Sequence, residues 1–350
     1  TFCEGGSVTL SSSPASYYEW RNDQNQPVWY QKDFATGTAG SYYVKVGDAN
    51  GCEGSSVSTT VTTNPAPAPT ITANGPTSFC QGGSVTLSAP NGFSNYLWSN
   101  GATTKNITVN STGNYSVSVT NANSCSGVSN NIYVFANPLP VPYVTANGSL
   151  SFCEGGSVKL SAENGYNSYL WSNGSTAKSI TVKTAGTYTV TVTNSSGCTG
   201  TSATKTVTVN PLPSPTISAG GPLSFCQGGS VTLTAPNGYS SYLWSNNATA
   251  KSITVSTSGK YNVTVTNNNG CSGKSADVTV TVNPVPSPNV TASGPTTFCD
   301  GGSVTLSPSD NGTYLWSNDA TSRYITVKTS GSYSVSVSSN GCSRTSSAKT

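Results

Sequence analysis

The chain repeats one sequence pattern five times. Each copy carries Phe-Cys-x-Gly-Gly-Ser-Val, a Tyr-x-Trp, a Gly-x-Tyr and a second Cys, and the first four copies are followed by a proline-rich segment. The pairs Asn64-Pro65, Asn137-Pro138, Asn210-Pro211 and Asn283-Pro284 recur every 73 residues. A fixed period of this size indicates an array of small domains instead of the two or three larger ones that length alone would suggest.

The Asn-Pro pairs set the expected domain boundaries, at 1–64, 65–137, 138–210, 211–283 and 284–350. The first repeat is expected to lack its first strand and to carry a hairpin insertion, and the fifth to have an incomplete last strand. No methionine occurs and no hydrophobic signal segment precedes Thr1. We therefore expect these 350 residues to be part of a longer array.

The ten cysteines fall as two per repeat. With no histidine and no CxxC motif, zinc ligation is disfavoured and disulfides are favoured. We predict one disulfide within each repeat, clamping one end of the domain and indicating an oxidising, extracytoplasmic compartment. The predicted pairs are Cys3/Cys52, Cys80/Cys125, Cys153/Cys198, Cys226/Cys271 and Cys299/Cys342.

Apolar residues alternate with polar ones along each repeat, and no segment has the spacing of an amphipathic helix. In the second copy, strands are expected near 70–73, 84–88, 95–99, 105–109, 114–120 and 128–135. Short strands separated by turn residues are typical of an all-β sandwich.

Two aromatic positions narrow the sandwich to an immunoglobulin-like one. A Trp follows the first Cys by 17 or 18 positions, and the Tyr of Gly-x-Tyr precedes the second Cys by nine or ten, as a tyrosine corner would. We expect both in the core. They are Trp20, Trp98, Trp171, Trp244 and Trp316, and Tyr42, Tyr115, Tyr188, Tyr261 and Tyr333.

The segments 78–87 (SFCQGGSVTL), 96–101 (YLWSNG) and 186–192 (GTYTVTV) carry a resemblance to a known family. They resemble the tandem immunoglobulin-like repeats of very large secreted surface proteins of Bacteroidota, including the gliding-motility adhesins exported by type 9 secretion. The resemblance covers the whole chain. It implies a secreted, cell-surface protein that is anchored through parts outside these residues.

Nothing in the sequence favours catalysis. The absence of histidine removes Ser-His and Cys-His nucleophiles, and the repeated position after the first Cys alternates between acid and amide (Glu4, Gln81, Glu154, Gln227, Asp300). A shared acidic or metal site is therefore not expected, and no cofactor is. A net charge of +3 that is scattered along the chain does not favour nucleic-acid binding.

Two features are candidate contact sites. If the Trp of Tyr-Leu-Trp faces the core, Leu97, Leu170, Leu243 and Leu315 point outward, either as a stripe for lateral self-association or as single leucines covered by a neighbouring loop or linker. The first repeat has five extra residues between Trp20 and Tyr42, including Trp29 and Tyr30. These are either a binding tip or a longer hairpin with its own small cluster.

The linkers have the form Pro-x-Pro-x-Pro, which favours polyproline II and predicts an extended rod of domains. The leading hypothesis is the non-catalytic stalk of a cell-surface adhesin that contacts a substratum, a polysaccharide or another surface ligand. One alternative is a structural subunit of an extracellular filament or sheath. Another is a spacer or carbohydrate-binding segment of a secreted multidomain hydrolase.

Overall fold

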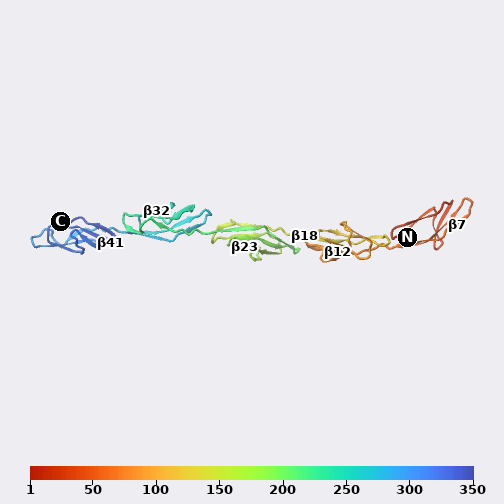
Figure 1. Cartoon of the computed structure of the whole chain (residues 1–350), viewed down its shortest axis with the longest axis horizontal. Coiled ribbons are helices and arrows are strands. Elements are labelled where there is room, and N and C mark those ends of the chain that lie inside the picture. Colours follow the sequence, from red (N-terminus) through yellow and green to blue (C-terminus); the bar gives the residue numbers. More distant parts are fainter. The chain divides into compact units, whose positions relative to one another are not determined.

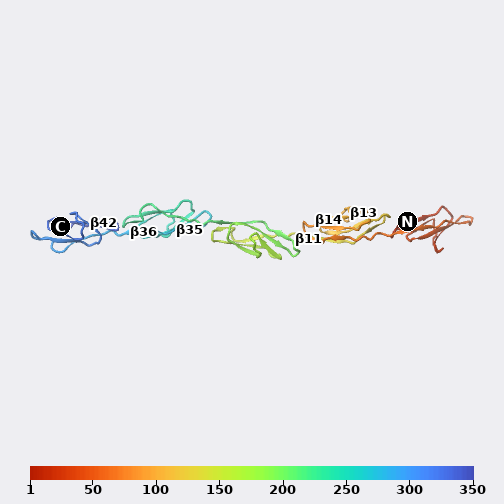
Figure 2. The same ribbon diagram turned by 60° about the horizontal axis from the view of Figure 1, so that its bottom comes forward.

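A computed structural model describes all residues 1–350 and contains only strands, turns and loops. Strands follow one another along the whole chain, and both views show strands and loops without any helix (Figures 1 and 2). No helix suited to crossing a membrane is present. The chain divides into two compact units. The first unit comprises residues 1–144, 162–178 and 189–203, and the second comprises 145–161, 179–188 and 204–350.

The second repeat lies entirely in the first unit and shows the plan of the domain. Its strands are β10 (Thr72–Asn74), β11 (Ser78–Cys80), β12 (Val85–Ser88), β13 (Asn95–Trp98), β14 (Asn106–Val109), β15 (Gly113–Tyr115), β16 (Val117–Thr120), β17 (Ser126–Val128) and β18 (Ile132–Asn137). They form sheets in the orders β10-β12-β14, β13-β16-β17 and β11-β18-β15. In the last of these, β11 pairs parallel with β18.

Period-two alternation builds the core of this repeat. Leu87 of β12 and Val117 and Val119 of β16 are completely buried, as is the Trp98 side chain apart from 2% of its surface. The polar residues between them face the other way. The Trp98 indole donates to the Thr104 carbonyl at 2.7 Å. The fold is therefore held by one apolar layer between the sheets.

A tyrosine corner closes the connection before β15. The Tyr115 hydroxyl donates to the Ser111 carbonyl four residues upstream at 3.1 Å, while its ring is buried. The same bond recurs in every copy, from Tyr42 to Thr38, Tyr188 to Thr184, Tyr261 to Thr257 and Tyr333 to Thr329. The chain is thus a tandem array of immunoglobulin-like β-sandwich repeats.

The fourth repeat lies in the second unit and has the same plan. Its strands are β28 (Ser218–Ala219), β29 (Ser224–Cys226), β30 (Val231–Thr234), β31 (Ser241–Trp244), β32 (Ser252–Val255), β33 (Gly259–Tyr261), β34 (Val263–Thr266), β35 (Ser272–Lys274) and β36 (Val278–Asn283). Their sheets are β28-β30-β32, β31-β34-β35 and β29-β36-β33. Leu233, Trp244, Val263, Val265 and Val280 are at the centre of its core.

The third repeat contributes strands to both units. The sheet β22 (Ser168–Trp171), β25 (Val190–Thr193) and β26 (Thr199–Thr201) belongs to the first unit. The other strands are β19 (Val144–Asn147), β20 (Ser151–Cys153), β21 (Val158–Ala162), β23 (Ser179–Val182), β24 (Gly186–Tyr188) and β27 (Lys205–Asn210), which lie almost wholly in the second unit. They form the sheets β19-β21-β23 and β20-β27-β24.

The first repeat departs from the plan in its second sheet. Its strands are β1 (Phe2–Cys3), β2 (Val8–Ser11), β3 (Tyr17–Asn22), β4 (Pro27–Trp29), β5 (Asp33–Thr36), β6 (Gly40–Gly47), β7 (Glu53–Ser55), β8 (Thr59–Val61) and β9 (Thr63–Asn64). The additional strand β4 pairs with β3 and forms the hairpin that the extra residues predicted. β1 pairs parallel with β9, as β11 does with β18.

The fifth repeat contains β37 (Val290–Ala292), β38 (Val304–Pro308), β39 (Thr313–Trp316), β40 (Ile325–Val327), β41 (Val335–Ser339) and β42 (Cys342–Thr345). In place of the pairing between β33 and β36 it has a single bridge between Tyr333 and Lys349. A cavity of about 190 Å³ lies there, lined by Phe298, Leu306, Gly331 and Tyr333 among others.

Candidate functional site

The disulfides join each repeat to the next one, so the predicted pairing within repeats is wrong. The observed bridges are Cys3–Cys125, Cys80–Cys198, Cys153–Cys271 and Cys226–Cys342, with Cα separations of 5.4–5.6 Å. The first Cys of one repeat is always bonded to the second Cys of the following repeat. Within these 350 residues, Cys52 and Cys299 have no cysteine partner, and both are exposed.

The parallel strand β11 explains why pairing within a repeat is impossible. Register places Cys80 beside Asn137, at the end of β18, whereas Cys125 lies immediately before β17, the strand that precedes β18. The twelve residues from Cys125 to Asn137 span about 40 Å at the rise of a β-strand. A disulfide requires Cα atoms within about 7 Å. The two cysteines of a repeat therefore lie at opposite ends of it, and each faces a neighbouring repeat.

An asparagine holds the second Cys and the incoming linker together. The Asn121 side-chain oxygen accepts from the Cys125 backbone N–H at 3.0 Å, and its amide donates to the Pro65 carbonyl at 3.3 Å. Asn194 and Asn267 make the same contacts, with the carbonyls of Pro138 and Pro211. The junction is therefore a built contact as well as a covalent one.

A glycine in β17 and in the equivalent strands of the next two repeats allows the linker to approach. A Cβ added at Gly127, in β17, would lie 1.7 Å from the Pro67 carbonyl oxygen, and the distances at Gly200 and Gly273 are 1.8 and 1.7 Å, to Pro140 and Pro213. Close approach of backbone to backbone is a reason for glycine within a strand. The linkers are thus docked on the following repeat.

We predict that Gly127→Ala displaces the linker and costs about 1–3 kcal/mol at this junction, because the methyl group cannot share space with the Pro67 oxygen. The measurement is the rate of proteolytic cleavage within residues 65–70, which should rise. Gly54→Ala is the matched control, because Gly54 has the same place after Cys52 but no atom within 4 Å of the added Cβ. Equal rates for the two variants would contradict linker docking.

The fourth junction differs from the other three. Arg344 stands where the glycine would be, and the turn before Cys342 is shortened to Asn340 and Gly341, both with positive φ. The Asn283 amide donates to the Asn340 carbonyl at 3.2 Å. A cavity of about 380 Å³ lies between the linker residues Pro284–Ser287 and Asp310. The bridge is therefore retained where the glycine contact is absent.

The two free thiols give a direct check of the pairing. In a protein made of residues 1–350 alone, we expect maleimide to label two cysteines, Cys52 and Cys299, because both are exposed and the other eight are bonded. Peptide mass spectrometry after labelling without reductant identifies the sites. Pairing within every repeat would leave no thiol to label. Labelling at any of the other eight positions would also contradict the observed bridges.

The four leucines that alternation placed outward are exposed. Leu97, Leu170, Leu243 and Leu315 have between 51% and 55% of their surface accessible, on β13, β22, β31 and β39. No loop or linker covers them. In the first repeat the corresponding residue is Glu19, so that face is polar there.

The inserted hairpin of the first repeat places its two aromatic residues differently. Trp29 lies with its ring 6.2 Å from that of Phe34, and its indole donates to the Asp33 carbonyl at 2.7 Å. Tyr30 is 60% exposed. Trp29, which is 42% exposed, therefore packs on the edge of the core at Phe34, and Tyr30 is the freer of the two for a contact.

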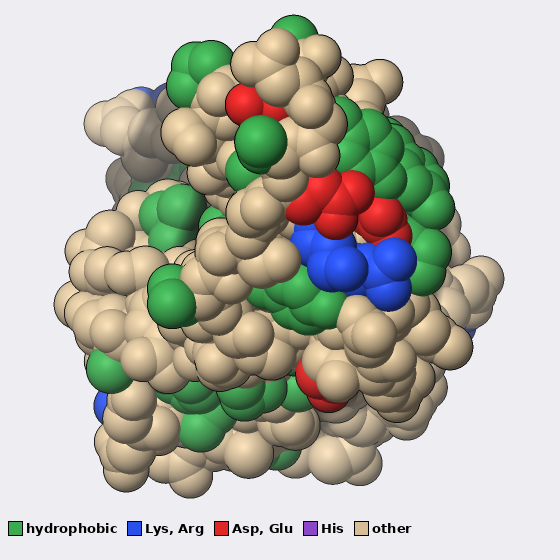
Figure 3. Space-filling model, turned by 90° about the vertical axis from the view of Figure 1, so that its right-hand side faces the viewer, with side chains coloured by type: hydrophobic (Ala, Val, Ile, Leu, Met, Phe, Trp, Pro, Cys, Tyr) green, Lys and Arg blue, Asp and Glu red, His purple; other side chains and the backbone are tan.

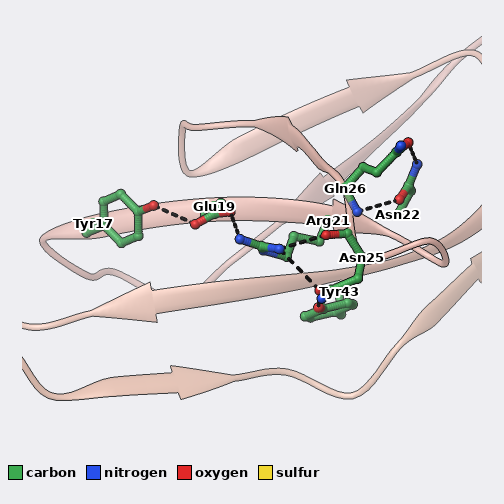
Figure 4. A network of polar contacts seen from close by, with 7 residues as sticks. All are labelled: Tyr17, Glu19, Arg21, Asn22, Asn25, Gln26 and Tyr43. Atoms are coloured by element: carbon green, nitrogen blue, oxygen red, sulfur yellow. Dashed lines mark hydrogen bonds and ion pairs between the residues drawn. The ribbon is translucent and has the colours of Figure 1, made fainter.

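A polar network covers the other face of this hairpin (Figure 4). Tyr17 donates to the Glu19 carboxylate at 2.7 Å, Glu19 pairs with Arg21, and Arg21 donates to the Asn25 carbonyl at 2.6 Å. The hydrogen bond from Tyr17 lowers the pKa of Glu19 and the same bond raises the pKa of Tyr17. Acidic and basic side chains also adjoin on the face in Figure 3, with hydrophobic side chains beside them.

The structure contains no group of three or more His, Cys, Asp or Glu residues that could hold a metal ion. In the second, third and fourth repeats, the aromatic residue three positions before the Tyr of Tyr-x-Trp packs against that Tyr, as Phe93 does on Tyr96 with ring centroids 6.2 Å apart. The main candidate functional feature of the chain is thus the set of four disulfide-bonded junctions between repeats. The exposed leucines and the hairpin of the first repeat are further candidate contact surfaces.

Comparison with known proteins gives a partial family match. The profile of the PKD-like domain matches residues 167–213, which include strands of the third repeat and the start of its linker. No curated protein sequence matches the chain. Domains of the immunoglobulin and PKD-like kind typically have a non-catalytic role.

Three solved structures are similar at low identity. The N-terminal eight Ig domains of Down Syndrome Cell Adhesion Molecule are 15% identical, with a TM-score of 0.29, over 98% of this chain and 66% of that one. Three N-terminal domains of the bacteriophage RB49 outer capsid protein Hoc are 16% identical, with a TM-score of 0.27, over 62% of this chain and 99% of that one. Bacteroides ovatus SGBP-B, in complex with a mixed-linkage heptasaccharide, is 18% identical, with a TM-score of 0.17, over 62% of this chain and 66% of that one.

Proposed function

We propose that the chain is part of the non-catalytic stalk of a large secreted adhesin at the cell surface. The observation that supports this most directly is the disulfide between each repeat and the next, from Cys3–Cys125 to Cys226–Cys342. An array whose successive domains are cross-linked is suited to transmitting force between a cell and a surface. Cross-links between successive domains give no advantage to a protein that acts through one catalytic site.

The chemistry of the bridges supports an extracellular location. Four structural disulfides persist only in an oxidising compartment, since cytosolic thiol buffers would reduce them. The low proportion of charged residues, 8%, and the Ser, Thr, Asn and Gly-rich surface fit a stalk that contacts few partners along its length. The resemblance to Bacteroidota surface adhesins agrees with this location, and gliding is the movement that the resemblance implies.

The ligand of such an adhesin is a polysaccharide or another component of the substratum. Within these residues, the exposed Tyr30 and the polar network around Arg21 form the surface of the first repeat that is least like the other copies. This surface is the first place to look for contact within the chain. A binding domain elsewhere in the full protein would leave these repeats as a spacer.

The test uses beads coated with antibody against these repeats, applied to living cells that produce the protein. Beads that bind and resist flow support a surface-exposed, load-bearing stalk, and beads that travel along the cell support gliding. Failure of the beads to bind intact cells, with binding to lysed cells, would overturn the proposal. Beads with non-immune antibody are the control.

The exposed leucines favour a second candidate, a subunit of an extracellular filament. Replacement of Leu97, Leu170, Leu243 and Leu315 by glutamate should then abolish lateral assembly, measured by sedimentation and electron microscopy. The matched control puts glutamate at Thr108, Thr181, Thr254 and Thr326, which are exposed on strands of the opposite sheets. Assembly that survives the leucine changes would exclude this candidate.

A further inference from the structure

The offset pairing gives the array two covalent routes that bypass most of the polypeptide. One route passes through Cys3–Cys125, along the chain to Cys153, and through Cys153–Cys271. The other passes through Cys80–Cys198, along the chain to Cys226, and through Cys226–Cys342. We propose that these two routes make the array nearly inextensible, so that domains can lose their fold under load without lengthening the chain. The proposal concerns mechanics and holds whatever the array binds.

The chain segments within the routes are already extended. The segment from Cys125 to Cys153 consists mainly of β17, β18, a proline-rich linker, β19 and β20, and the segment from Cys198 to Cys226 of β26, β27, a linker, β28 and β29. At the rise of a strand, these 28 residues measure about 90 Å along the backbone, and their upper limit is about 100 Å. Stretching each route therefore gains only about a tenth of its length.

The offset is what produces this limit. Between Cys3 and Cys271, the shortest covalent route contains about 28 residues, or about 100 Å when fully stretched. Bridges within each repeat would leave about 84 residues, or about 300 Å, because every segment between repeats would add to the route. Without bridges, the whole chain of about 268 residues could extend to about 960 Å.

The two routes lie side by side in the third repeat, where β20 of the first route pairs parallel with β27 of the second. Cys80–Cys198 spans the stretch of chain in which the first route passes from Cys125 to Cys153. Loss of one bridge therefore transfers the load to a longer route and does not sever the array. Reductant is the expected trigger that releases the stored length.

Optical tweezers test the proposal on the whole chain. One handle is attached at Thr1 and the other at an azide-bearing residue replacing Asn268, an exposed turn residue close to Cys271. Cys52→Ala and Cys299→Ala remove the free thiols from all samples. The oxidised chain should reach a contour length of about 120 Å and no more, and reductant should raise this to about 960 Å.

Two double variants separate the routes. Cys153→Ala with Cys271→Ala opens the route under tension, and the shortest remaining one contains about 117 residues, or about 420 Å. Cys226→Ala with Cys342→Ala removes a bridge that this route does not use, so its contour length should stay at about 120 Å.

Three outcomes would overturn the proposal. An oxidised chain that extends to about 500 Å would indicate bridges within repeats, because Cys3 then has no partner once Cys52 is replaced, and one that extends freely would indicate no bridges. A Cys226→Ala, Cys342→Ala chain that lengthens as much as the Cys153→Ala, Cys271→Ala chain would show that the routes are not separate. If a double variant fails to fold, the comparison of oxidised and reduced parent chain still decides, because it needs no bridge variant. The bead assay on cells is independent, so the stalk function and the inextensible array can fail separately.

Discussion

Cys80→Ala with Cys198→Ala should lower the free energy of unfolding of the second and third repeats by about 2–5 kcal/mol. The bridge closes a loop of 118 residues, and a loop of this size restricts the unfolded chain more than the loop of about 45 residues expected from pairing within a repeat. Removing both sulfur atoms creates no additional unpaired thiol. The effect is therefore that of the cross-link itself.

Hydrogen exchange in urea, followed by mass spectrometry, resolves the repeats that a single unfolding curve would merge. Peptides that cover β16 in the second repeat and β25 in the third should both exchange at lower urea. Cys52→Ala with Cys299→Ala is the control, because the same two changes at unbonded positions should leave exchange within about 0.5 kcal/mol of the parent. A loss confined to one repeat would contradict a bridge between two.

The strands could be predicted from the sequence because alternation is strong. The expected ranges 84–88, 95–99 and 105–109 agree closely with β12, β13 and β14. The single expected strand 114–120 is β15 and β16, with a break at Ser116. β11 was missed, since three residues give too short a pattern and its parallel partner β18 lies more than fifty residues away.

The disulfide pairing could not be predicted, because a strict repeat hides it. When every copy has the same two cysteines, pairing within a copy and pairing with the next copy give equally regular spacings. The pairing is decided by the parallel register of β11 and β18, which places Cys80 opposite Asn137. This register is a property of the folded sheet and cannot be read from the spacing of the cysteines. One signal was available: glycine recurs two positions after the second Cys, at Gly54, Gly127, Gly200 and Gly273, within an otherwise β-forming segment.

The outward direction of the leucines, in contrast, could be predicted from the sequence, because it needs only two neighbouring residues. Once Trp98 is assigned to the core, alternation fixes Leu97 on the opposite face, and it is exposed there. Alternation says nothing of what meets that face in an assembly. Alternation also could not predict which of Trp29 and Tyr30 packs on the repeat and which stays accessible. The contact of Trp29 with Phe34 depends on how the hairpin folds back on the repeat.

Trp244→Ala should destabilise the fourth repeat by about 3–5 kcal/mol, an effect at the upper end of what a single substitution in a core causes. The indole is 1% exposed among Leu233, Val263 and Val265, and it donates to the Ala250 carbonyl at 2.8 Å. Its removal leaves a cavity and an acceptor without its donor, and a small domain has little stability to spare.

The adjacent residue provides the control. Leu243→Ala removes a side chain on the same strand, β31, that is 51% exposed, so its cost should stay within about 0.5 kcal/mol. Hydrogen exchange in urea, read in peptides covering β34, measures both variants. Because the bridges Cys153–Cys271 and Cys226–Cys342 hold this repeat to both neighbours, the Trp244→Ala chain should keep its oxidised contour length although the repeat unfolds more readily. A comparable loss of stability in both variants would show that β31 does not alternate between core and solvent.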